Sequence, residues 1–211
     1  MPADSSVTKA RILAAAERLF ADNGFDGVSL RAIAREAKVQ IALIHYHFES
    51  KEGLYRAVWR ERYGPLAQRR NYDFPRLDFS RDRLEVLRDV VNLFVKPLLE
   101  DPSERLFLKI MAHEFSDPME PVRGVVGDYL DPVAGLVMAA FRRVLPELSD
   151  ADLGWGYQAM NGVLMLHVVD VDRTTRLSKG AARSGDTKTA LPAICDYIVG
   201  GWIALAKKEK A

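Results

Sequence analysis

Residues 28–55 read VSLRAIAREAKVQIALIHYHFESKEGLY, and their apolar side chains recur at helical spacing in two short segments. The apolar positions are Leu30, Ile33, Ala34 and Ala37 in the first segment and Ile41, Ile44 and Phe48 in the second. A helix-turn-helix needs about three or four residues between its supporting helix and the helix that enters a DNA groove. Residues 37–40 supply a join of that length, so the stretch predicts a helix-turn-helix.

The second of these helices presents two different faces. Ile44 and Phe48 share one face, which we expect to pack against the preceding helices. The opposite face must then point outward, where a groove-reading helix contacts thymine methyl groups and the edges of bases. We expect His45 to read a base edge or a neighbouring phosphate. The residues expected to contact thymine methyl groups are Ile41, Ala42 and Leu43.

The segments on either side of this stretch also have helical patterns. A first helix, with Thr8 or Ser6 as its cap, carries an apolar stripe at Ile12, Leu13, Ala16, Leu19 and Phe20. It is expected to end at Asn23-Gly24, because glycine accepts the left-handed conformation at a helix C-terminus. Ser29 is a suitable N-cap for the supporting helix, and Ser50 is one for a fourth helix that reaches about residue 63.

The run KARILAAAERLFADNGFDGVSLRAIAREAKV, followed by HYHFESKEGLY, resembles the DNA-binding domain of the TetR family of transcriptional regulators over about residues 7–60. The resemblance implies an all-α, homodimeric, ligand-controlled repressor with its dimer interface in the C-terminal domain. It also implies that Tyr46 and His47 contact phosphate or base, and that Lys51 grips the phosphate backbone together with backbone N–H groups at the start of the fourth helix.

Two further phosphate contacts are expected from Ser29 and Arg31, although N-capping explains Ser29 equally well. An alternative stays open for the recognition helix. In that alternative His45 and His47 are merely solvated, and Tyr46 packs at a domain boundary.

This sequence departs from the family pattern at three positions of the motif. Similar sequences often have Gly where Lys38 stands, so Lys38 either adopts a positive φ or belongs to a slightly different turn. They often have Tyr at the position of His45 and a small polar residue at that of Gln40, which we include among the DNA-contacting residues. The preferred DNA sequence therefore does not transfer from the family.

Composition places the chain among globular proteins and limits the role of bulk charge. The 211 residues are 48% hydrophobic and carry a formal net charge of +1, so attraction to nucleic acid must come from local charge. We expect a DNA-binding domain over residues 1–63, a linker over residues 64–79, where two prolines interrupt any helical stripe, and a helical effector-binding and dimerisation domain over residues 80–211.

Two apolar helices close the sequence and are the expected dimer interface. The first, capped by Ser149, runs from residue 153 to about 171 and carries small residues at Gly154, Gly156, Ala159 and Gly162, which let another helix approach closely. The second spans residues 191 to about 207. Together with their symmetry mates they would form a four-helix interface. Residues 173–188 between them, rich in polar residues and glycine, are expected to form a mobile loop.

The larger domain is expected to bind a small, mainly apolar effector in a pocket that combines apolar side chains with a few polar groups. The predicted lining is Phe94, Phe107, Met111, His113, Met138, Asn161, Met165 and His167. The alternative for each of these residues is an ordinary place in the core, hydrogen-bonded where the side chain is polar, or in an interface.

Other classes of function have weaker support in the sequence. We see no phosphate-binding glycine loop, nucleophile elbow or metal-ligand spacing, and therefore expect neither cofactor nor metal. Cys195 is the only cysteine and is expected to be buried. With no apolar signal core and no uninterrupted apolar run of about 18 residues, we expect a cytoplasmic protein that does not enter a membrane. An enzyme, or a helix-turn-helix protein without effector control, remains the alternative.

Overall fold

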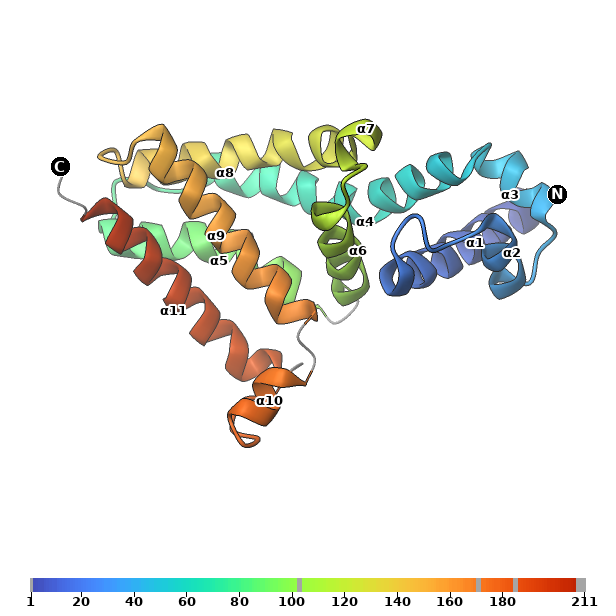
Figure 1. The fold of residues 1–211 in the computed structure, drawn as a ribbon. Coiled ribbons are helices and arrows are strands. Elements are labelled where there is room, and N and C mark those ends of the chain that lie inside the picture. Colours follow the sequence, from blue (N-terminus) through green and yellow to red (C-terminus); the bar gives the residue numbers. More distant parts are fainter. Residues whose placement is uncertain (1, 102–103, 170–171, 184–185, 208–211) are drawn as a thin grey trace. The chain divides into compact units, whose positions relative to one another are not determined.

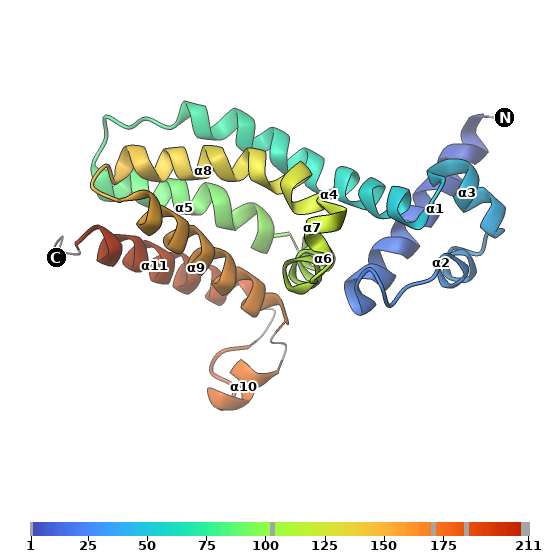
Figure 2. The same ribbon diagram turned by 45° about the horizontal axis from the view of Figure 1, so that its top comes forward.

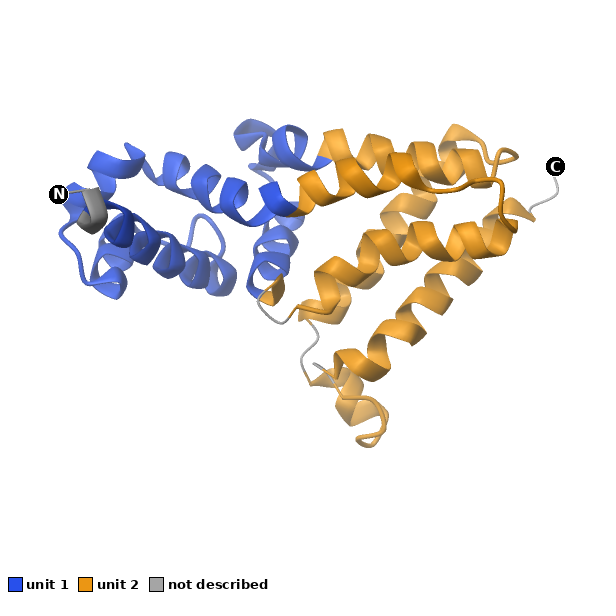
Figure 3. Ribbon diagram, turned by 180° about the vertical axis from the view of Figure 1, so that it is seen from behind, with its two compact units in different colours: residues 1–65, 106–130 blue, residues 66–105, 131–211 orange. Residues whose placement is uncertain are grey.

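The computed structural model describes residues 2–101, 104–169, 172–183 and 186–207, and every regular element among them is a helix (Figure 1; Figure 2). The all-α fold expected from the sequence is confirmed. The chain divides into two compact units that do not follow sequence order (Figure 3). Unit 1 comprises residues 1–65 and 106–130, and unit 2 comprises residues 66–105 and 131–211. Residues 106–130 thus belong with the helix-turn-helix.

Unit 1 contains the helix-turn-helix and its support. Its helices are α1 (Pro2–Asn23), α2 (Leu30–Ala37), α3 (Ile41–Phe48), the first part of α4 (Lys51–Asp73), most of α6 (Glu104–Ser116), α7 (Glu120–Arg123) and the π-helical turn η2 (Val126–Leu130). Helix α2 packs against both α1 and α3. The largest fully buried apolar side chains of these three helices form the local core: Ile12, Phe20, Ile33 and Ile44. The two faces predicted for the recognition helix are therefore present.

The sequence left two possibilities for Lys38, a positive φ or a different turn, and the structure has the first. This residue adopts the left-handed conformation, with φ 53° and ψ 50°. The N–H of Val39 donates to the carbonyl of Ala34, and the N–H of Lys38 donates to that of Arg35, which is the Schellman pattern that ends many helices. The guanidinium of Arg11 in α1 also donates to the carbonyls of Ala37 and Lys38, at 2.6 and 3.1 Å. Backbone hydrogen bonds to α2 and side-chain hydrogen bonds from Arg11 thus hold Lys38 in its strained conformation.

Two expectations about helix limits in this region are wrong. Helix α1 begins at Pro2, so Ser6 and Thr8 lie inside it and do not cap it. Helix α4 continues through Pro65 to Asp73 and is followed by the 3₁₀ turn η1 (Phe74–Arg76), so most of the predicted linker over residues 64–79 is helical. The sequence shows no apolar stripe in this part of α4, because one of its buried residues is the charged Arg70. Its guanidinium stacks on the ring of Phe94 at 4.4 Å and donates to the Phe94 carbonyl.

Unit 2 is a helical bundle. It contains α5 (Arg83–Leu99), α8 (Asp131–Val144), α9 (Asp150–Val169), α10 (Arg173–Leu177) and α11 (Thr187–Ala206). Helix α11 packs against α5 and α9, and α8 packs against α5 and α9 (Figure 2). The rings of Phe141 and Trp202 stack with centroids 3.9 Å apart, and both are buried. Cys195 is buried, as predicted.

The expectation of a loop over residues 173–188 is wrong at both ends. Helix α10 occupies Arg173–Leu177, and α11 begins at Thr187, four residues before its predicted start. Ser149 does cap α9, because its hydroxyl accepts a hydrogen bond from the N–H of Asp152 at 3.1 Å. Where α9 meets α11, Gly156 leaves space for Trp202: a Cβ on Gly156 would lie 2.5 Å from that ring. The same Cβ on Gly154 would meet nothing within 4 Å.

We predict that Lys38→Gly stabilises the protein. Glycine removes the steric cost of the left-handed conformation and loses more backbone entropy on folding, and the net gain is about 0.5–1 kcal/mol in the free energy of unfolding. Urea denaturation followed by circular dichroism measures the change. Lys38→Ala is the matched control, because it removes the same long side chain but keeps the Cβ. Equal stability of the two variants would show that the turn is not strained at this residue.

Candidate DNA-binding surface

The outward face of α3 carries an unusual set of exposed apolar and aromatic side chains. Ile44 is fully buried, whereas Tyr46 is 78% exposed, Leu43 38% and Ile41 37%. Gln40, Ala42 and His45 are exposed as well, and His47 is half-buried. Large apolar groups in water lower solubility without contributing to the core, so their placement on one short helix indicates a surface that is covered by a partner. The six residues of α3 predicted to contact DNA, and Gln40 directly before the helix, therefore lie together.

The C-terminus of α3 is closed by a tight γ-turn that restrains His45. Glu49 has φ 65° and ψ −52°, and the N–H of Ser50 donates to the carbonyl of Phe48 at 2.7 Å. The Nδ1–H of His45 donates to the carbonyl of Glu49 at 3.0 Å, since a carbonyl oxygen only accepts. That bond leaves Nε2 as the ring atom available to an outside partner.

The N-termini of α2 and α4 are capped by serines. The N–H of Ala32 donates to the hydroxyl of Ser29 at 3.1 Å, and the N–H of Gly53 donates to that of Ser50 at 2.9 Å. Gly53 has no room for a side chain, because a Cβ there would lie 2.2 Å from the Phe48 carbonyl oxygen. N-capping thus accounts for Ser29. Its expected contact with phosphate, and that of the exposed Arg31, stay predictions.

Lys51, the predicted phosphate ligand, lies against an aromatic ring. Its ammonium is 4.3 Å from the centre of the Phe25 ring, and the Arg123 guanidinium is 4.7 Å from the same ring. The pKa of Lys51 is lowered chiefly by burial; Asp26 raises it and Arg123 lowers it further. Phe25 therefore lies beside two cations, one of which comes from α7.

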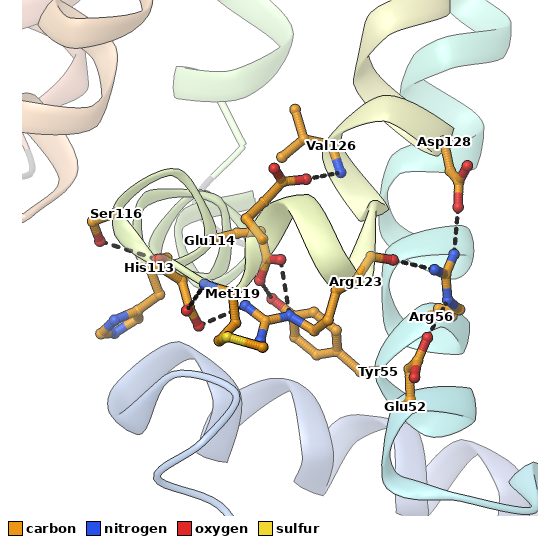
Figure 4. Close-up of polar contacts among 12 residues, drawn as sticks. Glu52, Tyr55, Arg56, His113, Glu114, Ser116, Met119, Arg123, Val126 and Asp128 are labelled. Carbon is orange, nitrogen blue, oxygen red and sulfur yellow. Dashed lines mark hydrogen bonds and ion pairs between the residues drawn. The ribbon is translucent and has the colours of Figure 1, made fainter.

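A buried polar network that the sequence does not predict joins α4 to α6 and α7 (Figure 4). The Glu114 carboxylate accepts hydrogen bonds from the Tyr55 hydroxyl at 2.7 Å and from Arg123 Nε at 3.0 Å. Arg123 Nη2 also reaches Asp117 at 2.5 Å. Tyr55 and Glu114 are 59 residues apart in the sequence, so no local spacing pattern connects them. Arg11, which caps α2, was missed for the same reason.

The residues predicted to bind an effector divide between the two units. Phe107, Met111 and His113 belong to unit 1, and the other five, Phe94, Met138, Asn161, Met165 and His167, belong to unit 2. Phe107 is buried with its ring 5.1 Å from that of Trp59, and the exposed His113 lies beside Gly24. In unit 2, the pKa of His167 is lowered by burial and by Arg105. The effector site stays a prediction.

The capped, close-packed helices α2 and α3, with the exposed face of α3, define a helix-turn-helix DNA-binding protein. The family model "Bacterial regulatory proteins, tetR family" matches residues 12–58, and "Tetracyclin repressor-like, C-terminal domain" matches residues 92–201. The second match covers more than half of the chain. The chain belongs to the TetR family of transcriptional regulators.

Individual relatives agree with this assignment. The chain is 29% identical over 114 residues to the HTH-type transcriptional regulator AcrR of Shigella flexneri, covering 53% of this chain and about half, 51%, of that relative. It is 30% identical over 137 residues to the HTH-type nicotine-responsive transcriptional repressor HdnoR of Paenarthrobacter nicotinovorans, covering 63% and 69% of the two chains. The crystal structure of FadR from Bacillus subtilis in complex with stearoyl-CoA has the same fold, with a TM-score of 0.58, 18% identity and coverage of 91% and 98%.

Proposed function

We propose that the protein is a homodimeric repressor that binds a pseudo-palindromic operator and is released by a small, mainly apolar effector. The observation that carries this proposal is the exposed face of α3, where Tyr46 and its neighbours stand outside the packed helix-turn-helix. In the dimer two such helices would enter successive major grooves, roughly 34–36 Å apart. Phosphate contacts supply affinity, and the surface of α3 supplies sequence preference. The protein would act in the cytoplasm, where bacterial DNA lies.

The dimer is proposed from the outward faces of α9 and α11. Trp155 is 66% exposed and Tyr197 72%, and they line an apolar groove of about 270 Å³ between the two helices. Among the described residues one helix, α11, is long and apolar enough to cross a membrane by length and composition, and little of it is buried. A second copy would cover this face, because α9, α11 and their symmetry mates form a four-helix interface related by a two-fold axis.

The effector is proposed from the C-terminal domain and from the family. Members of this class pair a DNA-binding domain with a ligand-binding domain. The relative HdnoR is named as nicotine-responsive, and the structural neighbour FadR was crystallised in complex with stearoyl-CoA. Binding must favour a state in which the two α3 helices no longer match the operator spacing, which requires different affinities for the two states. Release of bound DNA by such compounds in a retardation assay tests this part.

Two other functions are less well supported. A helix-turn-helix protein without effector control would not need the domain matched over residues 92–201. The matched families are transcription regulators and not enzyme families. Neither alternative explains both the exposed α3 face and the size of the C-terminal half.

We predict that Tyr46→Ala weakens binding to DNA selected from a random pool by the wild type about tenfold or more, the usual cost of a lost specific contact. Wild-type affinity should itself fall by a hundredfold or more between about 50 and 200 mM salt, because phosphate contacts release counterions. Gel retardation measures both effects. Tyr72→Ala, at another exposed tyrosine, is the control. Unchanged affinity in Tyr46→Ala would remove α3 from the DNA interface.

We predict that Trp155→Glu converts a dimer into a monomer, because it places a charge in the apolar interface. Analytical ultracentrifugation measures the mass, and circular dichroism confirms that the helices are retained. Tyr72→Glu adds the same charge at an exposed tyrosine outside this face and should leave the dimer intact. A monomeric wild type, or a dimeric Trp155→Glu variant, would contradict the proposed interface.

A further inference from the structure

Glu114 is the most deeply buried charged side chain among the described residues, with an exposed fraction of 1%. Its two carboxylate oxygens have separate partners: Oε2 accepts from the Tyr55 hydroxyl, and Oε1 accepts from Arg123 Nε. Arg123, 7% exposed, has a second acid, Asp117, for its Nη2. These residues come from α4, α6, α7 and the segment before α7 (Figure 4). None of them is predicted to touch DNA or effector.

A buried charge is tolerated only when its partners and its geometry are kept. Removing one member leaves the others desolvated and unpaired, which costs far more than the intact pair contributes. The pKa of Tyr55 is well above its ordinary value, first because of burial and then because its hydroxyl bonds to the Glu114 carboxylate, so Tyr55 stays the donor. The network is therefore satisfied in one arrangement of α4, α6 and α7 and is costly in others.

The network also reaches the segment that precedes the helix-turn-helix. The Tyr55 ring lies edge-on to Phe20 of α1 and to Phe25 of the following turn, with centroids 4.9 and 5.0 Å apart. The Arg123 guanidinium lies over Phe25, as does Lys51 at the start of α4. An aromatic ring with a cation over its face gains electrostatic energy from a defined geometry. The same residues thus contact α1, the turn before α2 and the first turns of α4.

A second set of contacts holds α4 to the segment after α7. Arg56 donates to the carboxylate of Asp128 at 2.5 Å and to the backbone carbonyl of Arg123. The hydroxyl of Tyr129 donates to the carbonyl of Arg56 at 3.1 Å. The adjacent residues Tyr55 and Arg56 of α4 therefore bond to Glu114 of α6 and to Arg123 and Asp128, at the end of α7 and after it (Figure 4).

We propose that Glu114 and Arg123 are positioning residues for DNA binding. They hold α6 and α7 to α4 and to the turn before α2. Helices α6 and α7 therefore form one rigid group with the helices that position α3 for DNA binding. The inference rests on the proposed function, because it requires that α3 reads DNA.

A purely electrostatic role and a positioning role for Glu114 predict opposite changes in the DNA affinity of Glu114→Gln. Glu114→Gln keeps the size of the side chain and removes a negative charge, which leaves Arg123 less neutralised beside Phe25 and Lys51. If charge alone mattered, DNA affinity would rise and its salt dependence would steepen. A positioning role predicts weaker binding with an unchanged salt slope, because the phosphate contacts are the same but are no longer held in one arrangement.

The test compares operator affinity and salt slope for the wild type, Glu114→Gln and Tyr55→Phe, with correctly folded protein confirmed by circular dichroism. We expect both variants to bind the selected DNA about tenfold more weakly, within the range of known coupling energies. Asp22→Asn is the matched control. It also removes a carboxylate from an ion pair between α1 and α6, but the Asp22–Lys109 pair is exposed and 3.4 Å long, so affinity should be unchanged.

Hydrogen exchange provides a readout that does not depend on DNA. In Glu114→Gln and Tyr55→Phe we expect backbone exchange of residues 24–30 and 51–56 to rise about tenfold, with no such rise in Asp22→Asn. If Glu114→Gln does not fold, Tyr55→Phe, which loses only a hydroxyl, decides the outcome.

The proposal is overturned by wild-type affinity in the folded variants, by tighter binding of Glu114→Gln, or by unchanged exchange. Failure of the wild type to bind any selected DNA would instead overturn the proposed function, and the exchange data would still show whether the network holds residues 24–30.

Discussion

The burial of Ile44 is the constraint on which the DNA-binding surface depends. Helix α3 is only eight residues long, and such a helix has little stability of its own. Burying Ile44 and Phe48 in the core of unit 1 prevents it from rotating about its axis. With that face inside, Tyr46, His45 and their neighbours can only point outward. The left-handed Lys38 before α3 and the γ-turn at Glu49 after it set its two ends.

Helices of unit 1 that lie far along the chain, α6 and α7, are also held in place relative to the DNA-binding helices. The Glu114–Arg123 pair and Tyr55 require α4, α6 and α7 to keep one arrangement, and the Phe25 ring connects that arrangement to the turn before α2. Helix α4 and helix α6 each begin in one unit and end in the other, since the boundaries fall at Pro65 and Arg105. A third crossing follows η2, between residues 130 and 131, so the chain connects the two units covalently at three points.

The sequence predicted what local chemistry determines and missed what depends on distant partners. Ser29 and Ser149 cap helices as expected, and the two faces of α3 follow from spacing alone. Helix α4 was predicted to stop near residue 63 because the buried Arg70 does not register as part of an apolar stripe. The placement of residues 106–130 in unit 1 comes with long-range contacts such as Tyr55–Glu114, across 59 residues, which no pattern within a short segment contains. The residues predicted to line an effector pocket likewise follow no sequence spacing that would show whether they lie together.

The outward face of α3 is proposed to read DNA in two symmetric half-sites. Selection from a random DNA pool, carried out side by side with the wild type and with His45→Ala, tests it most directly. We expect an inverted repeat for the wild type, and for the variant a relaxed preference at one position, repeated symmetrically in both half-sites. The absence of any enriched inverted repeat, or an identical motif for both proteins, would contradict the reading role assigned to this helix and to His45.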